Sequence, residues 1–147
     1  MSLIIRHPNE NDLEGLTALM YEYIVDFYKC PKPPLQKIHH LIHTLQKEEK
    51  GIQFVAEDNG KLAGFATLYF TFSTTRAEPI TVMNDLYVAL EYRGTGAAEK
   101  LFRSCQTYSL LNQYAVMNWE TAHDNARAQR FYEKMGGSKE DWLTYSI

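Results

Sequence analysis

The segment Arg93-Gly94-Thr95-Gly96 lies between a predicted strand and a predicted helix. Glycines at such a turn let the backbone approach a ligand closely. The first amides of the helix lack partners within it, and together with the positive end of the helix dipole they can bind a pyrophosphate group. Arg93 adds a fixed charge that can contact two phosphate oxygens. The predicted anion site comprises Arg93, Gly94, Thr95, Gly96, Ala97 and Ala98.

This turn differs from two common phosphate-binding motifs. No Gly-Lys-Ser/Thr triplet follows it, as a Walker loop requires, and Glu99 stands where the dinucleotide fingerprint has its third glycine. A tight turn that only begins a helix is the alternative interpretation.

Asn125 and Tyr132 form a second candidate pair. They are seven positions apart on a predicted helix, so they share one face at a separation of roughly 10 Å. A positioned phenol, although a weak acid with a pKa of about 10, can donate a proton to a developing thiolate. Alternatively, Phe131 and Tyr132 are core aromatics and Gly136 ends the helix.

The elements that must position these groups follow from hydrophobic spacing and turn residues. We expect strands over residues 3–6, 52–57, 62–72, 80–89, 116–122 and 142–146, and helices over 13–27, 96–111 and 125–135. A further helix is expected from residue 35, ending near Lys50-Gly51. This order predicts an α/β (α+β) fold with a mixed sheet between helices, in a single domain over residues 1–147.

Composition excludes several classes of protein. The chain has 147 residues, is 45% hydrophobic and carries a formal charge of -3, which argues against general nucleic-acid binding. Cys30 and Cys105 have no CxxC spacing, so we expect a reduced, intracellular protein without a metal site. The longest mostly apolar stretch, residues 62–72, is too short to span a membrane. We therefore expect a cytoplasmic protein with no nucleic-acid or membrane partner.

The pattern Arg93-x-x-Gly96-x-Ala98, preceded by Leu86-Tyr87-Val88, resembles the acetyl-CoA loop of the GNAT family of N-acetyltransferases. The segment from Asn125 to Gly136 is similar to a later motif of that family, Asn-x-x-Ala-x-x-Phe/Leu-Tyr-x-x-x-Gly. The resemblance covers essentially the whole chain. It implies a GNAT-like fold with a mostly antiparallel sheet, acetyl-CoA as co-substrate, no metal, and direct acetyl transfer to a primary amine.

The resemblance also implies a role for each matching position. Arg93 to Ala98 would bind the pyrophosphate, and Leu86, Tyr87 and Val88 the pantetheine and thioester. The amide of Leu86 or Tyr87, on a strand with a bulge, would hold the thioester carbonyl. Asn125 would contact the pantetheine arm, and Tyr132 would protonate the leaving thiolate.

An acceptor amine must be neutral to react, whereas most free amines are protonated near pH 7. Asp85 is the carboxylate best placed to help, and Glu120 or an ordered water are alternative general bases. Glu22 and Asp26 are spaced to meet a cation together from one helix face, unless that face is only solvated. The predicted acceptor-binding residues are Glu22, Asp26, Asn84, Asp85 and Trp142.

Asp85-Leu86-Tyr87-Val88 and Glu140-x-Trp142 resemble the diamine (spermidine/spermine-type) branch of the family, although that branch has Glu where Asn84 stands. The resemblance implies a small polyamine-like or amino-acid-like acceptor and a homodimer. A protein N-terminus or a lysine side chain is an alternative acceptor. A non-catalytic acyl-CoA-binding or sensor module is the alternative from another class.

Overall fold

The computed structural model describes residues 2–147. Its strands are β1 (Leu3–Arg6), β2 (Gly51–Asp58), β3 (Lys61–Ser73), β4 (Glu78–Val88) and β5 (Met117–Asn118). Its α-helices are α1 (Leu13–Tyr21), α2 (Leu35–Gln46), α3 (Ala97–Leu111) and α4 (Ala126–Lys134). Two short 3₁₀ turns, η1 (Glu10–Asp12) and η3 (Leu90–Tyr92), and a π-helical segment, η2 (Glu22–Phe27), complete the set.

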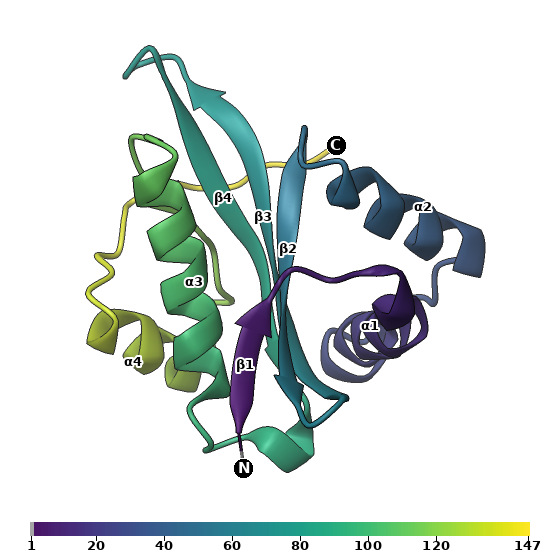
Figure 1. The fold of residues 1–147 in the computed structure, drawn as a ribbon. Coiled ribbons are helices and arrows are strands. Elements are labelled where there is room, and N and C mark those ends of the chain that lie inside the picture. Colours follow the sequence, from purple (N-terminus) through teal and green to yellow (C-terminus); the bar gives the residue numbers. More distant parts are fainter. Residues whose placement is uncertain (1) are drawn as a thin grey trace.

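The strands form one sheet in the order β1-β2-β3-β4-β5. The first four are antiparallel to their neighbours, and β5 is parallel to β4. Helices α1 and α2 cover one face of the sheet, and α3 and α4 lie on the other (Figure 1). The predicted mixed, mostly antiparallel sheet between helices is confirmed.

The β2–β3 hairpin shows how local sequence sets the register. Asn59 and Gly60 both have positive φ, 48° and 88°, which is the geometry of a two-residue turn that matches strand twist. The turn closes the pair between Asp58 and Lys61. A register shift at Ala63 follows, since Glu57 pairs with Leu62 but Ala56 with Gly64. The turn and this shift together fix which side chains of both strands enter the core.

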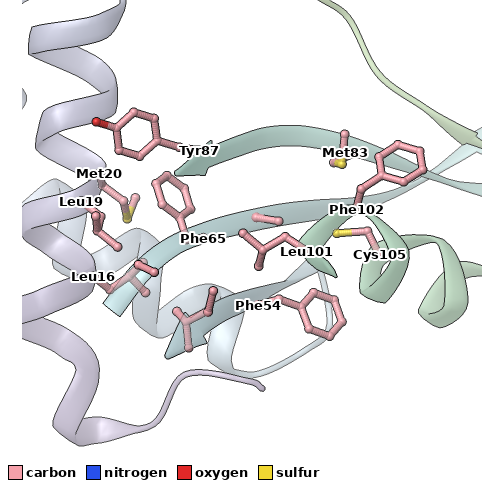
Figure 2. Packing of buried hydrophobic residues seen from close by; sticks show 14 of the residues in the cluster. Leu16, Leu19, Met20, Phe54, Phe65, Met83, Tyr87, Leu101, Phe102 and Cys105 are labelled. Atoms are coloured by element: carbon pink, nitrogen blue, oxygen red, sulfur yellow. The ribbon is translucent and has the colours of Figure 1, made fainter. Parts of the chain in front are cut away.

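The core has two layers, one on each face of the sheet. Leu16 and Met20 of α1 point toward Phe65 of β3, whereas Leu101 and Phe102 of α3 approach from the opposite face (Figure 2). All five are buried. Since both faces are covered, β2 and the first half of β3 are almost continuously buried, rather than alternating with polar residues.

A β-bulge interrupts the pairing of β3 with β4. Thr67 pairs with Asp85 and Leu68 with Met83, so Asn84 is an extra residue on β4. Met83 packs into the core near Phe102, as Figure 2 shows. Because the extra residue reverses the alternation of side chains, Asp85 lies on the opposite face, the one covered by α1.

Two predictions about strands were wrong. The strand expected over residues 116–122 is limited to Met117–Asn118, and the strand expected over 142–146 does not form. Residues 138–147 contain no helix or strand, and Trp142 is 84% exposed. A strand needs a neighbour to pair with its backbone groups. No strand among residues 2–147 pairs with this segment.

The helix expected over residues 13–27 changes type part-way. It is α-helical to Tyr21 and π-helical from Glu22 to Phe27, and it ends where Lys29 adopts a φ of 57°. The wider π turns rotate the last side chains relative to an ideal helix. Tyr23, seven positions after Leu16 and three after Met20, remains on the buried face of the helix and points at the sheet, with its ring centroid 5.6 Å from that of Phe65.

We expect Gly64→Ala to destabilise the protein by about 1–3 kcal/mol, the usual cost of overpacking. A Cβ at Gly64 would collide with the carbonyl oxygen of Tyr87 and lie 3.2 Å from Cα of Val88. Gly15→Ala is the control, because its Cβ would meet only the flexible side chain of Leu62, at 3.3 Å. Urea denaturation measures the stability of both variants. Equal midpoints would contradict the close approach of the β4 backbone to Gly64.

Candidate active site

The glycine turn lies between η3 and α3, at the end of β4. Gly94 and Gly96 have φ of 78° and 89°, values that favour glycine. Neither has any atom within 4 Å of the place where a Cβ would stand, so the backbone is open to a ligand. The Thr95 hydroxyl donates to the carbonyl of Tyr92 at 2.5 Å, which tightens the turn before α3 begins at Ala97.

Arg93 lies at the base of this turn and is exposed. Its Nε donates to the carbonyl of Val88 at 3.4 Å, and it forms no ion pair with any of residues 2–147. The guanidinium therefore stays beside the end of β4 with its charge uncompensated. The predicted residues from Arg93 to Ala98 are thus brought together at an open helix N-terminus, where a pyrophosphate could bind.

An open edge of β4 leads to the glycine turn. β5 pairs only with Thr81 and Val82, so within residues 2–147 no strand lies beside β4 on that side from Met83 onward. The amide of Ala89 donates to Ala63 at 2.8 Å. Because peptide directions alternate along a strand, the amide of Tyr87 also faces β3, whereas those of Leu86 and Val88 face the open edge. Of the two amides expected to hold a carbonyl, only that of Leu86 points outward.

Tyr132 lies on α4 among aromatic side chains. Its ring centroid is 5.4 Å from that of Trp119 and 6.3 Å from that of Phe102. Burial raises the pKa of its phenol to about 12, and the nearby phenol of Tyr28 adds to the increase. Tyr132 is therefore protonated at neutral pH and can act as a hydrogen-bond donor.

Asn125 caps the same helix. Its side-chain oxygen accepts a hydrogen bond from the amide of Ala128 at 3.1 Å, which satisfies one of the unpaired amides at the start of α4. This contact leaves the side-chain NH₂ group available for another partner.

Asp85 lies beside the bulge, among hydroxyl and amide donors. Burial raises the pKa of its carboxyl, and hydrogen bonds from Thr67, Tyr23 and Asn84 oppose the increase. The Asn84 amide donates to Asp85 Oδ1 at 3.0 Å, and the Tyr23 hydroxyl donates to the Asn84 carbonyl at 3.5 Å. Both residues expected to bind the acceptor from β4 are thus brought together with Tyr23 of η2.

The rings around Asp85 form an aromatic cluster. It comprises Tyr23, Phe27, Tyr28, Phe65 and Tyr87. The centroid of Tyr23 lies 4.9 Å from that of Tyr28 and 5.6 Å from that of Tyr87. The sequence interpretation missed Phe27 and Tyr28 as site residues. For Phe27 the sequence held a signal, because this residue lies four positions after Tyr23 on the predicted helix.

The two acidic residues of η2 lie next to this cluster. Glu22 accepts a hydrogen bond from the Tyr87 hydroxyl at 3.1 Å, and Figure 2 shows that hydroxyl directed toward the helix. Burial raises the pKa of Tyr87, and the charges of Glu22 and Asp26 raise it further, whereas Arg93 lowers it. Carboxylates, aromatic rings and the arginine of the glycine turn therefore lie at one end of the sheet.

Two predicted residues are not brought into this arrangement. Trp142 is exposed in the C-terminal segment, without helix or strand around it. Glu120 is exposed and accepts a hydrogen bond from Thr144 at 3.5 Å. The structure provides no contact that would support either role.

A family comparison decides the wider assignment. The profile of the Acetyltransferase (GNAT) family matches residues 17–137, which include the glycine turn, the open edge of β4 and Tyr132. The chain belongs to the GNAT acetyltransferase family. It is an acetyl-CoA-dependent acyltransferase, and the family assignment stated for the glycine turn and the α4 motif is confirmed. The diamine branch is not confirmed.

Two curated relatives cover most of this GNAT chain. An uncharacterized N-acetyltransferase of Bacillus subtilis (strain 168), YhfO, is 29% identical over 132 residues, which are 90% of this chain and 87% of the relative. An uncharacterized N-acetyltransferase of Archaeoglobus fulgidus is 26% identical over 132 residues, 87% of this chain and 88% of the relative.

Solved structures share the fold. A structure of AAC(6')-Iy with a bisubstrate analog has a TM-score of 0.85 and 18% identity, and covers 100% of this chain and 98% of that one. A ribosomal-protein-alanine N-acetyltransferase from Brucella melitensis has a TM-score of 0.80 and 18% identity, over 99% of both chains. Their names give different acceptor classes, so the shared GNAT fold does not decide the acceptor.

Residues 2–147 lack both a membrane-spanning helix and a metal-binding cluster. None of the helices there has the length and apolar character needed to cross a membrane. No three or more His, Cys, Asp or Glu side chains in that range gather closely enough to hold a metal ion.

We expect Trp119→Ala to lower the pKa of Tyr132 from about 12 toward the ordinary range, because removing the indole lets water reach the phenol. NMR titration of ¹³C-labelled tyrosine, assigned with Tyr132→Phe, measures the change. Trp142→Ala is the control, since this second tryptophan is exposed and its loss should leave the titration unchanged. An unaltered Tyr132 titration in Trp119→Ala would contradict burial as the cause.

Proposed function

We propose that residues 1–147 form one N-acetyltransferase domain that moves the acetyl group of acetyl-CoA directly to a primary amine of a small cationic molecule. One observation carries the proposal. The open edge of β4 runs from Asp85, among carboxylates and aromatic rings, to the glycine turn at the start of α3. An acyl donor and a cationic acceptor would therefore meet along the same few residues of one strand.

The glycine turn suits the diphosphate of the co-substrate. Gly94 and Gly96 leave open space at the backbone, and the amides that begin α3 have no acceptors within the helix. Arg93 supplies the positive charge. The Leu86 amide, which faces the open edge, would donate to the thioester carbonyl and stabilise the negative charge that develops there, an effect worth about 3 kcal/mol in comparable sites.

Asp85 is the residue we assign to the amine. An ammonium group would be attracted to its carboxylate and to the faces of Tyr23 and Tyr28, because aromatic rings attract cations. The carboxylate would accept one proton from the ammonium, which frees the nitrogen lone pair. Direct attack on the thioester then forms the C–N bond and breaks the C–S bond. The nitrogen loses its second proton, and the thiolate sulfur takes up a proton to leave as free CoA thiol.

Tyr132 would donate a hydrogen bond to the leaving sulfur. With a pKa of about 12, its phenol is a weaker acid than a thiol of about 8.5, so complete proton transfer is uphill by roughly 3 pH units or about 5 kcal/mol. A hydrogen bond to the developing thiolate avoids that cost. This role replaces full protonation, which the resemblance implies.

The acidic and aromatic character of the site favours a small polyamine-like or amino-acid-like acceptor. Glu22 and Asp26 place negative charge beside the aromatic cluster. An acceptor with two cationic groups would therefore place one at Asp85 and the other at Glu22 and Asp26. AAC(6')-Iy, which shares this fold, is an aminoglycoside N-acetyltransferase, and this is consistent with a small polycationic acceptor.

An amine panel tests the proposal. Release of free CoA thiol from acetyl-CoA is measured with diamines, polyamines, aminoglycosides, amino acids and peptides with free N-termini or lysines. Amine-dependent turnover with a small cation supports the proposal. Turnover with peptides alone would favour a protein acetyltransferase, and binding of acetyl-CoA without turnover on any amine would favour a sensor.

We expect Arg93→Ala to weaken acetyl-CoA binding about tenfold, the effect of losing one charged hydrogen bond. Isothermal titration calorimetry measures the dissociation constant. Arg76→Ala is the matched control, because Arg76 lies in the exposed β3–β4 turn. Equal affinities in the two variants would contradict the placement of the pyrophosphate.

We expect Tyr132→Phe to lower kcat about 10- to 100-fold, as loss of a hydrogen bond to a developing charge predicts, and to leave acetyl-CoA affinity unchanged. Tyr145→Phe, in the exposed C-terminal segment, removes a hydroxyl without touching the site and should retain full turnover. A Tyr132→Phe enzyme as fast as this control would remove Tyr132 from the mechanism.

A further inference from the structure

A pair of polar side chains is buried beneath Asp85. Gln53 of β2 and Thr67 of β3 are partners in the sheet register, and their exposed fractions are 2% and 0%. Both lie on the face covered by α1, where the Gln53 amide also contacts the sulfur of Met20 at 3.9 Å. Neither residue reaches the open edge of β4, so neither can touch a substrate there.

Their hydrogen bonds run in one direction. Gln53 Nε2 donates to Thr67 Oγ1 at 3.2 Å. A hydroxyl has a single proton, and with its oxygen already accepting from Gln53, that proton is available to a further acceptor. Thr67 lies directly opposite Asp85 in the β3–β4 register, so their side chains share a face of the sheet, and the Thr67 hydroxyl lowers the pKa of that carboxyl. The series therefore runs from Gln53 through Thr67 to Asp85.

This arrangement is costly unless it serves the site. The side-chain oxygen of Gln53 is buried without a partner, and an unpaired buried polar group disfavours folding. Apolar side chains at both positions would avoid that cost. The polar pair instead supplies a fixed donor to a carboxylate in an environment that disfavours its charge.

We propose that Thr67 and Gln53 are positioning residues that orient the Asp85 carboxylate and keep it ionised for the acceptor amine. The inference rests on the proposed function for the role of the ionised carboxylate, which is to accept a proton from the amine. The effect of Thr67 and Gln53 on the pKa of Asp85 does not depend on that function. It adds two residues from neighbouring strands that never contact a substrate.

The surroundings of Asp85 make these donors important. The groups that face it are Tyr23 from η2, Thr67 and Tyr69 from β3, and Asn84 from β4. All are uncharged at neutral pH, and among residues 2–147 no cation acts on the pKa of this carboxyl. Without an arginine or lysine partner, neutral hydrogen bonds alone offset the burial.

The direct test is the titration of Asp85 by ¹³C NMR, with the carboxyl resonance assigned through Asp85→Asn. Thr67→Val keeps the shape of the side chain but removes the donor. We expect the pKa of Asp85 to rise by about one unit, because losing a hydrogen bond to the charged form disfavours that form. Thr67→Ser retains the hydroxyl and should restore the original value. Gln53→Leu should give a smaller rise.

Thr81→Val is the matched control. Thr81 is also 0% exposed and its hydroxyl is bonded to Ser109 at 2.7 Å, but that pair lies on the α3 side of the sheet. Its loss removes a buried hydroxyl without changing the surroundings of Asp85. If Thr67→Val and Thr81→Val give the same Asp85 titration, the proposal is wrong. Thr67→Ala provides the same comparison if Thr67→Val does not fold.

Turnover gives a second readout. The acid limb of the pH profile of kcat/KM should move to higher pH in Thr67→Val by the same amount as the pKa, because only the ionised carboxylate accepts a proton. A shifted NMR titration without amine acetylation would support the positioning pair and contradict the proposed function. Acetylation with an unshifted titration would support the function and overturn the positioning pair.

Discussion

The extra residue at Asn84, in the pairing of β3 with β4, determines which side chains reach each face of the sheet. Met83 and Asp85 are two positions apart, so on a regular strand they would share a face. The bulge separates them. Met83 then fills the core against α3, and Asp85 joins Tyr23 and Tyr87 on the face covered by α1. Without this shift, a carboxylate would point into the apolar layer around Phe102.

The early end of β5 is the second constraint on the site. With pairing limited to Thr81 and Val82, the outward amides of Leu86 and Val88 have no strand partner. A buried amide in that state would cost about 1–3 kcal/mol, so such an edge persists only where water or a ligand reaches it. The same opening that admits a thioester therefore also allows the strand to remain unpaired. A longer β5 would satisfy the amides and close the site.

Much of the fold follows from patterns that are local in sequence. Periodicity predicted α3 and the start of α2 to within a residue, although α2 ends at Gln46 and not near Lys50. Asn59-Gly60 specified its hairpin because both residues tolerate positive φ. The expected strand over residues 142–146 failed because alternation of residue types gives no information about whether a neighbouring strand is available. The open edge of β4 likewise depends on where β5 ends, so the sequence left Leu86 and Tyr87 as equal candidates.

The candidate site was predictable only where its residues are contiguous. Arg93 to Ala98 form one turn, and their proximity follows from the chain itself. Thr67 and Gln53 come from two other strands, and only the sheet register brings them to Asp85. Asn84 was interpreted as a lost carboxylate, because the branch has Glu there. In the bulge, the Asn84 amide instead donates a hydrogen bond to Asp85. A glutamate at this position would carry a negative charge and repel the Asp85 carboxylate.

The surroundings of Asp85 act on both partners of the proposed proton transfer. The pKa values of an ordinary ammonium and an ordinary aspartate differ by about 6.5 units, which makes the transfer uphill by roughly 9 kcal/mol. Burial disfavours both charges, so it raises the pKa of the carboxyl and lowers that of the amine. The difference between the two pKa values therefore becomes smaller. Burial alone favours the protonated carboxyl, the form that cannot accept a proton. Thr67, Tyr23 and Asn84 lower the pKa of the carboxyl and so oppose the effect of burial on Asp85, but not its effect on the amine. The aromatic cluster thus reduces the free-energy cost of the proton transfer, while the hydrogen bonds keep the carboxylate able to accept the proton.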